Sequence, residues 1–169
     1  MTAEEQPFPS AARPGAFTPD ELETWSSLAT LLEWLPVALD AQLRTAADLS
    51  HFEFGVLFAL SRAPEHTLRM RILAGYANST LSRLSRAAGR MERRGLVVRR
   101  TDPHDGRSTL ATLTEAGLAL VEGATPGHVG LVRRIVLDAL SPAERDQMRG
   151  IAQRITRAIS EHDSWSPSL

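Results

Sequence analysis

The fold is decided by one stretch of the chain, residues 78–113, which reads NSTLSRLSRAAGRMERRGLVVRRTDPHDGRSTLATL. Its first half has apolar residues at spacings of three and four, which predicts a helix that ends near Arg94 with Asn78-Ser79 as its N-cap. Gly95 follows a basic last turn, as is typical of a residue that ends a helix. Residues 96–100 then read as a short strand, and residues 108–113 alternate enough for a second. They flank a cluster of turn-forming residues, which predicts a β-hairpin.

The helix predicted over residues 78–94 has an apolar face and a basic face. The apolar face is expected to point inward and carries Leu81, Leu84, Ala88 and Met91. The opposite face carries Thr80, Arg83, Arg86, Arg90 and Arg94. Such a face is either a solvated helix surface or a surface that binds phosphates. Residues 61–110 hold 11 arginines against 4 acidic residues, whereas residues 1–60 hold 2 against 9, so the positive charge is concentrated around this helix.

The residues before this stretch predict three helices. Thr18-Pro19-Asp20-Glu21 has the pattern of a helix start, and the apolar periodicity that follows it extends towards residue 48. Pro36 lies inside this first helix and is expected to kink or split it. A second helix is expected over 49–60 with Ser50 or Asp48 as its cap. A short third helix is expected over 69–77, with its inward side chains being Ile72, Leu73 and Tyr76.

The residues after the hairpin predict two more helices. Thr114-Glu115 begins the first of them, in which a kink is expected near Pro126. Ser141-Pro142-Ala143-Glu144 is a capping-box pattern that opens the last helix. The apolar residues of that helix are Met148, Ile151, Ile155 and Ile159. Residues 1–17 have no periodicity and are predicted to be a flexible tail, and residues 164–169 are expected to fray.

The order of these elements indicates a fold that is mainly α with a small β-hairpin wing. Three helices followed by a hairpin form a winged helix-turn-helix, in which the later helix enters the major groove of DNA. The hydroxyl and guanidinium groups near the start of that helix suit contacts with base edges and phosphates. These candidate DNA-binding residues are Ser79, Thr80, Ser82, Arg83, Ser85 and Arg86. Arg107 lies at the hairpin tip, where an arginine on a slender loop can enter a minor groove.

Composition excludes several classes of protein. The chain has 169 residues, of which 43% are hydrophobic and 23% charged, which is ordinary for a globular domain with a core. It has no cysteine, which excludes disulfides, thiolate metal sites and cysteine nucleophiles. No signal-peptide pattern begins the chain, and its longest uncharged apolar run, 54–61, is too short to span a bilayer. We therefore expect a soluble cytoplasmic protein with no membrane partner.

Four motifs in order resemble the multiple-antibiotic-resistance regulator (MarR) family. They are Ser85-Arg86 within the recognition helix, Arg93-Arg94-Gly95-Leu96-Val97 at its end, Asp102-Pro103-His104-Asp105-Gly106-Arg107-Ser108 in the wing and Leu113-Thr114-Glu115-Ala116-Gly117 at the next helix. Each motif is weak alone, whereas the four together at workable spacing are specific. The resemblance covers about 140 residues. The flanking helices match the family in their pattern and not in any motif.

The resemblance implies a homodimeric regulator of transcription that binds a palindromic site in double-stranded DNA. Residues 18–48 and 114–163 would then be N- and C-terminal dimerisation helices, and residues 49–113 the DNA-binding part. Many members are repressors that a small aromatic or phenolic ligand releases from DNA. By position in the motifs, Arg107 would enter the minor groove with Asp105 pairing with it and orienting it, and Arg90 would contact a phosphate.

Candidates for lining a ligand pocket are Trp34, His51, Phe54 and Phe58, although aromatic residues at helical spacing are more often core. The departures from the family pattern are Gly89 within the recognition helix, Ile72 at a position that is often acidic, and Gly106 in the wing. His128 is interpreted as a surface residue at a helix end.

Alternative functions have weaker support in the sequence. His51 and Glu53 are two residues apart and so lie on different helix faces, and no metal or cofactor site is expected. His104, Asp105 and Ser108 share one hairpin and lack the shielding that a catalytic triad needs, so an enzyme is not expected. The remaining alternative is a helical dimeric interaction or ligand-binding protein that has lost specific DNA binding, and the arginine-lined helix argues against it.

Overall fold

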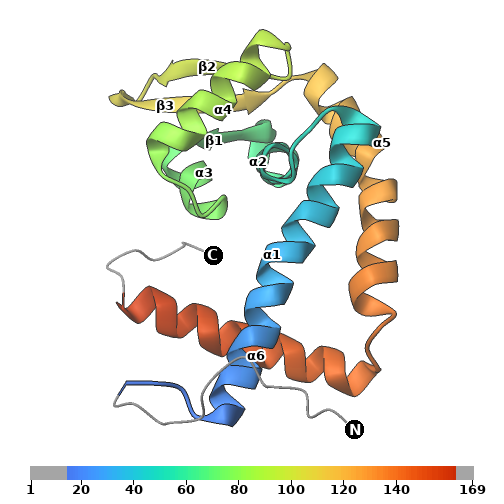
Figure 1. Ribbon diagram of the computed structural model, residues 1–169. Helices are drawn as coiled ribbons and strands as arrows, with labels where there is room; N and C mark the ends of the chain where they lie inside the picture. The colour runs from blue at the N-terminus through green and yellow to red at the C-terminus, as the bar shows by residue number, and fades with distance from the viewer. Residues whose placement is uncertain (1–14, 163–169) are drawn as a thin grey trace, which may run out of the picture. The chain divides into compact units, whose positions relative to one another are not determined.

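A computed structural model describes residues 15–162, and Figure 1 shows their arrangement as helices with one small sheet. The described residues form two compact units, which divide between Val37 and Ala38. The mainly helical fold with a β-hairpin wing is confirmed. The predicted tails lie largely outside the described residues, at 1–14 and 164–169.

The first helix, α1 (Pro19–Ala47), contributes to both units. Its start is the predicted capping box, in which the Thr18 backbone N–H donates to Glu21 Oε2 at 2.7 Å and the Glu21 N–H donates to Thr18 Oγ1 at 3.3 Å. Pro36 lies inside the helix, so the expectation that it would split the helix is wrong. Each neighbouring residue adds one helical hydrogen bond, and together these outweigh the one bond that Pro36 does not donate.

Two helices and a short strand follow α1. The helix α2 (His51–Arg62) is capped by Ser50, in a capping box with Glu53. The strand β1 (Thr67–Arg69) then leads directly into α3 (Met70–Tyr76). Leu73 is buried as expected, but Ile72 and Tyr76 are 43% and 53% exposed, so their predicted inward positions are wrong. A helix of only two turns has one narrow buried side, which Met70, Leu73 and Ala74 already fill.

The helix α4 (Leu81–Arg93) is the arginine-rich helix of the central stretch. Its N-cap is Thr80 rather than Asn78-Ser79, because the Thr80 hydroxyl accepts the Arg83 N–H at 3.2 Å while Asn78 adopts a left-handed conformation in the turn. Leu84, Ala88 and Met91 are buried as predicted. Leu81 is 51% exposed, so its predicted inward position is wrong.

The sheet has three antiparallel strands in the order β1-β3-β2. The predicted hairpin consists of β2 (Val97–Asp102) and β3 (Asp105–Leu113), which we call the wing. Its register pairs Val97 with Leu113 and Asp102 with Asp105. The strand β1 was not predicted; it pairs Arg69 with Leu110 and so fixes the start of α3 to the wing.

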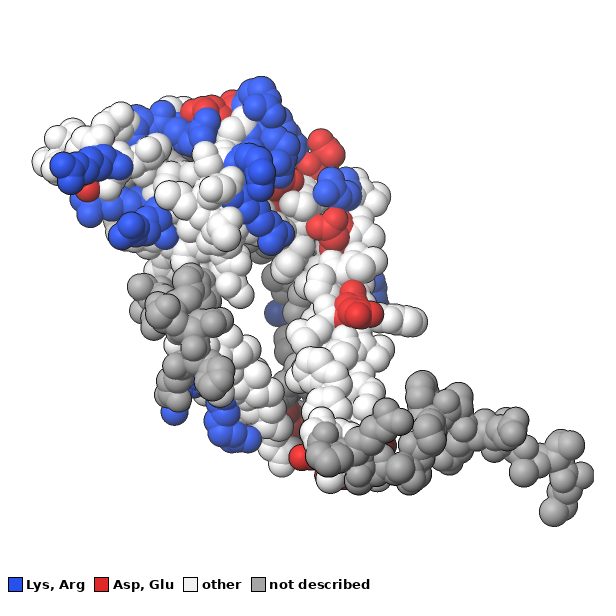
Figure 2. Space-filling view, turned by 60° about the vertical axis from the view of Figure 1, so that its left-hand side comes forward, with Lys and Arg blue, Asp and Glu red and all other residues white. Residues whose placement is uncertain are grey.

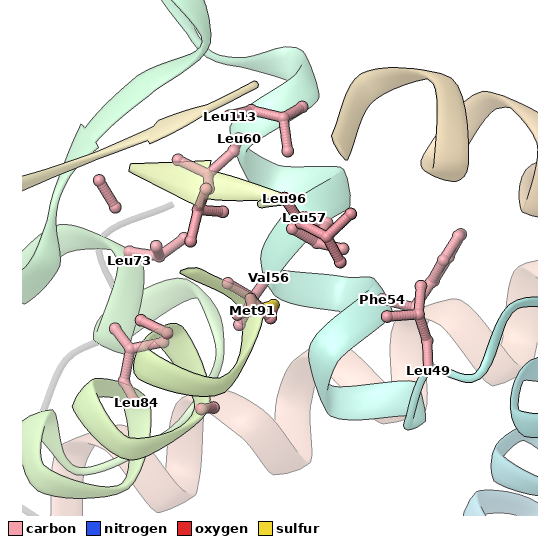
Figure 3. Close-up of a cluster of buried hydrophobic side chains, with 14 of the residues drawn as sticks. Leu49, Phe54, Val56, Leu57, Leu60, Leu73, Leu84, Met91, Leu96 and Leu113 are labelled. Carbon is pink, nitrogen blue, oxygen red and sulfur yellow. The ribbon is translucent and has the colours of Figure 1, made fainter. Parts of the chain in front are cut away.

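One buried cluster joins these elements, and Figure 3 shows its leucines around Val56 and Met91. Leu57 and Leu60 come from α2, Leu73 from α3, and Leu84 and Met91 from α4. Each of these five side chains has no more than 1% of its surface exposed. Because the cluster connects α3 and α4 to the strands, it holds the helix-turn-helix and the wing as one body.

Three helical segments follow the sheet: α5 (Glu115–Val132), a π-helical segment η2 (Arg133–Leu137) and α6 (Pro142–His162). The helix α5 continues through Pro126, and a π-helical segment that was not predicted begins at Arg133. The capping box of Ser141 and Glu144 is confirmed by a 2.7 Å hydrogen bond between their side chains and by their backbone contacts. Within residues 15–162, no helix is both long and apolar enough to cross a membrane.

Candidate nucleic-acid interface

The arginines of α4 do not all face the same way. At about 100° per residue, Arg83, Arg90 and Arg94 lie along the side of the helix next to α2. The Arg83 guanidinium stacks over the Phe52 ring with its carbon 4.6 Å from the ring centroid. Arg94 donates to the Asp48 carbonyl oxygen at 2.7 Å. The predicted basic face is therefore partly an internal contact between helices.

Arg90 forms the most buried of these contacts. Its Nε and Nη2 both donate to Glu53 Oε1, at 3.1 and 3.0 Å, and Glu53 is buried. Burial alone would raise the pKa of the Glu53 carboxyl, but the Ser50 N–H and the Arg90 guanidinium lower it below its ordinary value. One carboxylate thus completes the cap of α2 and binds α4. The predicted phosphate contact of Arg90 would have to compete with Glu53.

The outward side of α4 carries Ser82, Arg86, Gly89 and Arg93, which lie opposite the buried Leu84 and Met91. Arg86 and Arg93 are exposed, and within residues 15–162 neither guanidinium has a hydrogen bond or an ion pair. Arg93 was not among the predicted site residues. The helical period could have found it, because Arg93 is seven residues after Arg86 and therefore on the same face.

The hydroxyl groups near the start of α4 have separate positions. Thr80 caps the helix, and the Ser79 hydroxyl donates to the Thr80 carbonyl oxygen at 3.3 Å. Ser85 faces the wing, where its hydroxyl accepts from Arg99 Nη1 at 3.4 Å. Ser82 is exposed on the outward face. Of the predicted hydroxyls, Ser82 is the one that lies beside Arg86 on the outward face and is not used in a cap or a contact with the wing.

Arg99 of β2 fixes the wing to α4. Its guanidinium donates to Glu92 Oε2 at 2.7 and 3.0 Å, and its backbone N–H donates to the other oxygen of Glu92. The side-chain hydrogen bonds from Arg99, with that backbone N–H, lower the pKa of Glu92. A Cβ at position 89 would lie 3.5 Å from Arg99 Nη2, so Gly89 is where the helix backbone comes close to this neighbour.

The wing turn is organised by two aspartates. The Ser108 hydroxyl and the Arg107 backbone N–H donate to Asp105, at 2.7 and 3.2 Å, and these bonds lower its pKa. The expected contact between the Asp105 and Arg107 side chains is wrong, since the ion pairs of the described residues do not include it. Asp105 orients the backbone of Arg107 instead, and it leaves the guanidinium exposed.

Asp102 anchors the base of the wing turn, a role that sequence reasoning missed. Its side chain is buried, accepts the His104 N–H at 2.9 Å and binds Arg69 Nε at 2.8 Å. The His104 N–H, together with Arg69, lowers the pKa of Asp102 despite its burial. The first aspartate of the Asp-Pro motif was the available signal, but its partner Arg69 lies 33 residues earlier and could not be identified.

These elements enclose a groove of about 550 Å³ between α3, α4 and the wing. Its basic lining residues are Arg69, Arg71, Arg99 and Arg107. Figure 2 shows the blue arginine side chains gathered over the part of the surface that belongs to the helix-turn-helix and the wing. The lining of the groove also includes one carboxylate, Asp105, so arginines outnumber acidic residues in a concave surface, which favours a negatively charged ligand.

Only some of the residues that were predicted to line a ligand pocket lie close to one another. Phe54 is buried, with its ring centroid 5.9 Å from that of Phe58 and 4.7 Å from that of His128. His51 lies 5.6 Å from His128, centroid to centroid. The interpretation of His128 as a helix-end surface residue is wrong, because it lies within α5 against α2, where burial and the neighbouring His51 lower its pKa. Trp34 is 74% exposed and belongs to the other compact unit.

Three polar side-chain atoms at this contact of α1, α2 and α5 have no hydrogen-bond partner among residues 15–162. They are Gln42 Oε1, His51 Nδ1 and His128 Nδ1, each buried and without a hydrogen bond. Gln42 reaches the contact from α1, where its Nε2 would lie 3.2 Å from a Cβ at Gly127. Buried polar atoms without partners are costly, so they mark a place where another molecule could bind.

Comparisons with known proteins agree with this arrangement. The sequence model of the MarR family matches residues 47–108. Sco3205 from Streptomyces coelicolor, a MarR family transcriptional regulator in complex with DNA, is 35% identical with a TM-score of 0.83, covering 85% of this chain and 94% of that chain. AbsC from the same organism, also a MarR family transcriptional regulator, is 29% identical with a TM-score of 0.83, covering 86% of this chain and 98% of that chain.

A curated relative is similar over a shorter part. YkoM of Bacillus subtilis, an uncharacterized HTH-type transcriptional regulator, is 34% identical over 99 residues, which are 57% of this chain and 60% of that protein. The chain therefore spans about three fifths of the length of this curated relative.

Proposed function

The chain belongs to the MarR family of transcriptional regulators, and from this premise we propose that it is a homodimeric repressor. The dimer binds a palindromic operator in double-stranded DNA, and a small aromatic ligand releases it. Residues 49–113 are the DNA-binding part of each subunit, and residues 18–48 and 114–163 are the dimerisation helices.

One observation carries the DNA-binding proposal. The guanidiniums of Arg86 and Arg93 on α4 and of Arg107 on the wing are exposed and unpaired among the described residues. By contrast, Arg83 and Arg90 contact α2, and Arg94 binds Asp48. A helix in the major groove can read guanine through arginine, and an arginine on a wing can enter the adjacent minor groove. The structure of Sco3205 in complex with DNA supports DNA binding by this chain.

The proposed dimerisation helices have apolar surface to bury. On α6, Met148, Ile151, Ile155 and Ile159 form a stripe whose members are 38–54% exposed. On the N-terminal part of α1, large exposed apolar residues include Leu22, Trp25, Leu32 and Trp34. Surface of this kind is typical of obligate interfaces between subunits. Repression would then follow because the bound dimer covers promoter DNA.

The proposed ligand site is the contact of α1, α2 and α5. Its support is the set of unpartnered atoms on Gln42, His51 and His128 beside the rings of Phe54 and Phe58. Rings pack against an aromatic ligand, and imidazole or amide groups bind its polar substituents. A ligand at this site would release DNA only by binding more tightly to a conformation whose recognition helices are wrongly spaced.

The test is a titration of the purified protein against a fluorescent DNA fragment that flanks its own gene. It is done at two salt concentrations with random DNA as competitor. We expect binding that resists the competitor and weakens steeply with salt. Binding to the fragment that is no tighter than binding to random DNA, followed by failure to select any site from a random-sequence pool, would refute the proposal.

A further inference from the structure

The groove between α3 and the wing has more than one kind of lining. Arg71 and Ile72 come from α3, Leu81 from the start of α4, and Arg107 and Asp105 from the wing. Ile72 and Leu81 are 43% and 51% exposed, so both present apolar surface to the groove. The groove therefore offers cationic groups and an apolar surface to the same ligand.

The positive charge of the groove is not fully neutralised from within. Arg99 and Arg69 are paired with Glu92 and Asp102 respectively. The remaining carboxylate, Asp105, already accepts hydrogen bonds on both oxygens from the wing itself. Arg71 and Arg107 are exposed, and no ion pair or side-chain hydrogen bond of residues 15–162 involves either guanidinium. The groove thus presents two free guanidiniums, one on each side.

The position of the groove identifies its occupant, given the DNA-binding function proposed above. With α4 in a major groove and the wing in the adjacent minor groove, the DNA strand that separates the two grooves has to pass between α4 and the wing. We propose that the groove seats this sugar–phosphate strand and that Arg71 is a phosphate contact facing Arg107 across it. Leu81 then packs on deoxyribose, whose carbon atoms are the apolar part of the strand.

Arg71 is well placed for such a contact. It follows Met70, whose buried side chain belongs to the core, and Arg69, which is held by Asp102. The backbone before Arg71 is therefore fixed, and Leu73, two residues after it, is buried in the core, while the Arg71 side chain is exposed in the groove. A charged group on a rigid support loses less entropy on binding than one on a mobile loop.

The experiment compares the wild-type protein with Arg71→Gln on one selected operator. Arg134→Gln is the matched control, because Arg134 is equally exposed but lies on η2 outside the groove. For Arg71→Gln we expect affinity to fall by about tenfold per half-site. We also expect the slope of log affinity against log salt to decrease by about one per subunit. Circular dichroism and thermal unfolding should not change.

A second arm locates the contact on the DNA. Each operator phosphate in turn is replaced by an uncharged methylphosphonate, and binding is measured for both proteins. We expect the replacement of one phosphate, or of two adjacent phosphates, in each half-site to weaken DNA binding by the wild type but not by Arg71→Gln. The variant already lacks the arginine that contacts those phosphates. If Arg71→Gln keeps the wild-type salt slope, or remains as sensitive as the wild type at every linkage, the inference is overturned. If the wild-type protein does not bind its operator more tightly than random DNA, the proposed function is refuted, independently of the role of Arg71.

Discussion

The two glycines at positions 117 and 123 of α5 predict opposite effects of the same substitution. A Cβ at Gly117 would collide with the carbonyl oxygen of Leu96 and come within 2.7 Å of Leu113 Cδ1. A Cβ at Gly123, in the same helix, would have no atom within 4 Å. The start of α5 cannot move away easily, because Thr114 donates to the Leu96 carbonyl oxygen and to that of Gly95, at 3.1 and 2.7 Å.

The magnitudes follow from two opposing effects. Alanine is more favourable than glycine inside a helix by about 1 kcal/mol. Overpacking against fixed backbone costs up to about 3 kcal/mol. Gly117→Ala is therefore expected to lower the free energy of unfolding by about 2 kcal/mol. Gly123→Ala is expected to raise it by about 1 kcal/mol, since it gains the helical preference without a collision.

Urea unfolding followed by circular dichroism measures both variants against the wild type. All samples have the same protein concentration, because dimerisation would contribute to the midpoint. The midpoints should lie on opposite sides of the wild-type midpoint with unchanged slopes. If Gly117→Ala is as stable as Gly123→Ala, the close approach of α5 to Leu96 is not a feature of the folded protein, and the reasoning is refuted.

Three further predictions concern the interface. Arg107→Ala should weaken operator binding severely without changing the dimer in size-exclusion chromatography, and unchanged affinity would exclude the wing from the mechanism. Arg86→Ala should lower operator affinity at wild-type stability, whereas Arg90→Ala should lower stability by about 1 kcal/mol because Glu53 loses its partner. Thermal melts and DNA titrations of both variants distinguish the two roles, and identical profiles would contradict them. Because the folded pKa of Glu53 lies below its ordinary value of 4.5, its contribution is complete above that value and is lost as pH falls through the folded pKa. Glu53→Gln should therefore lose less stability than the wild type between about pH 5 and pH 3 in acid titration, and an equal loss would argue against the assignment.

Local patterns predicted the elements whose signals are themselves local. The capping boxes at Thr18 and Ser141 and the wing hairpin are set by side chains within a few residues of each other. The third strand, β1, is only Thr67–Arg69, and its strand character comes from pairing with residues 110–112. Nothing in three residues could predict a partner so distant in sequence.

The candidate site shows the same limit. The arginines of α4 form one basic face in a linear pattern, but at about 100° per residue they divide between α2 and the outward side. Which arginines were free depended on Phe52 and Glu53, more than 30 residues away in the chain. A list of the basic residues in the sequence therefore includes arginines that are bound within the protein. The helical period alone cannot identify them, because that requires knowing their partners in α2.

Arg94 connects the end of α4 to the end of α1. Arg94 follows the last residue of α4 and donates to the carbonyl oxygens of Asp48 and Ala47. The 13 residues of α4 are about 20 Å long, so if α4 and the body that contains it rotate together by about 10° about Arg94, Leu81 is displaced by about 3.4 Å. That displacement equals the rise of one base pair, about 3.4 Å. In the proposed complex with DNA, a small tilt at the end of α1 would therefore change which base pair the start of α4 faces.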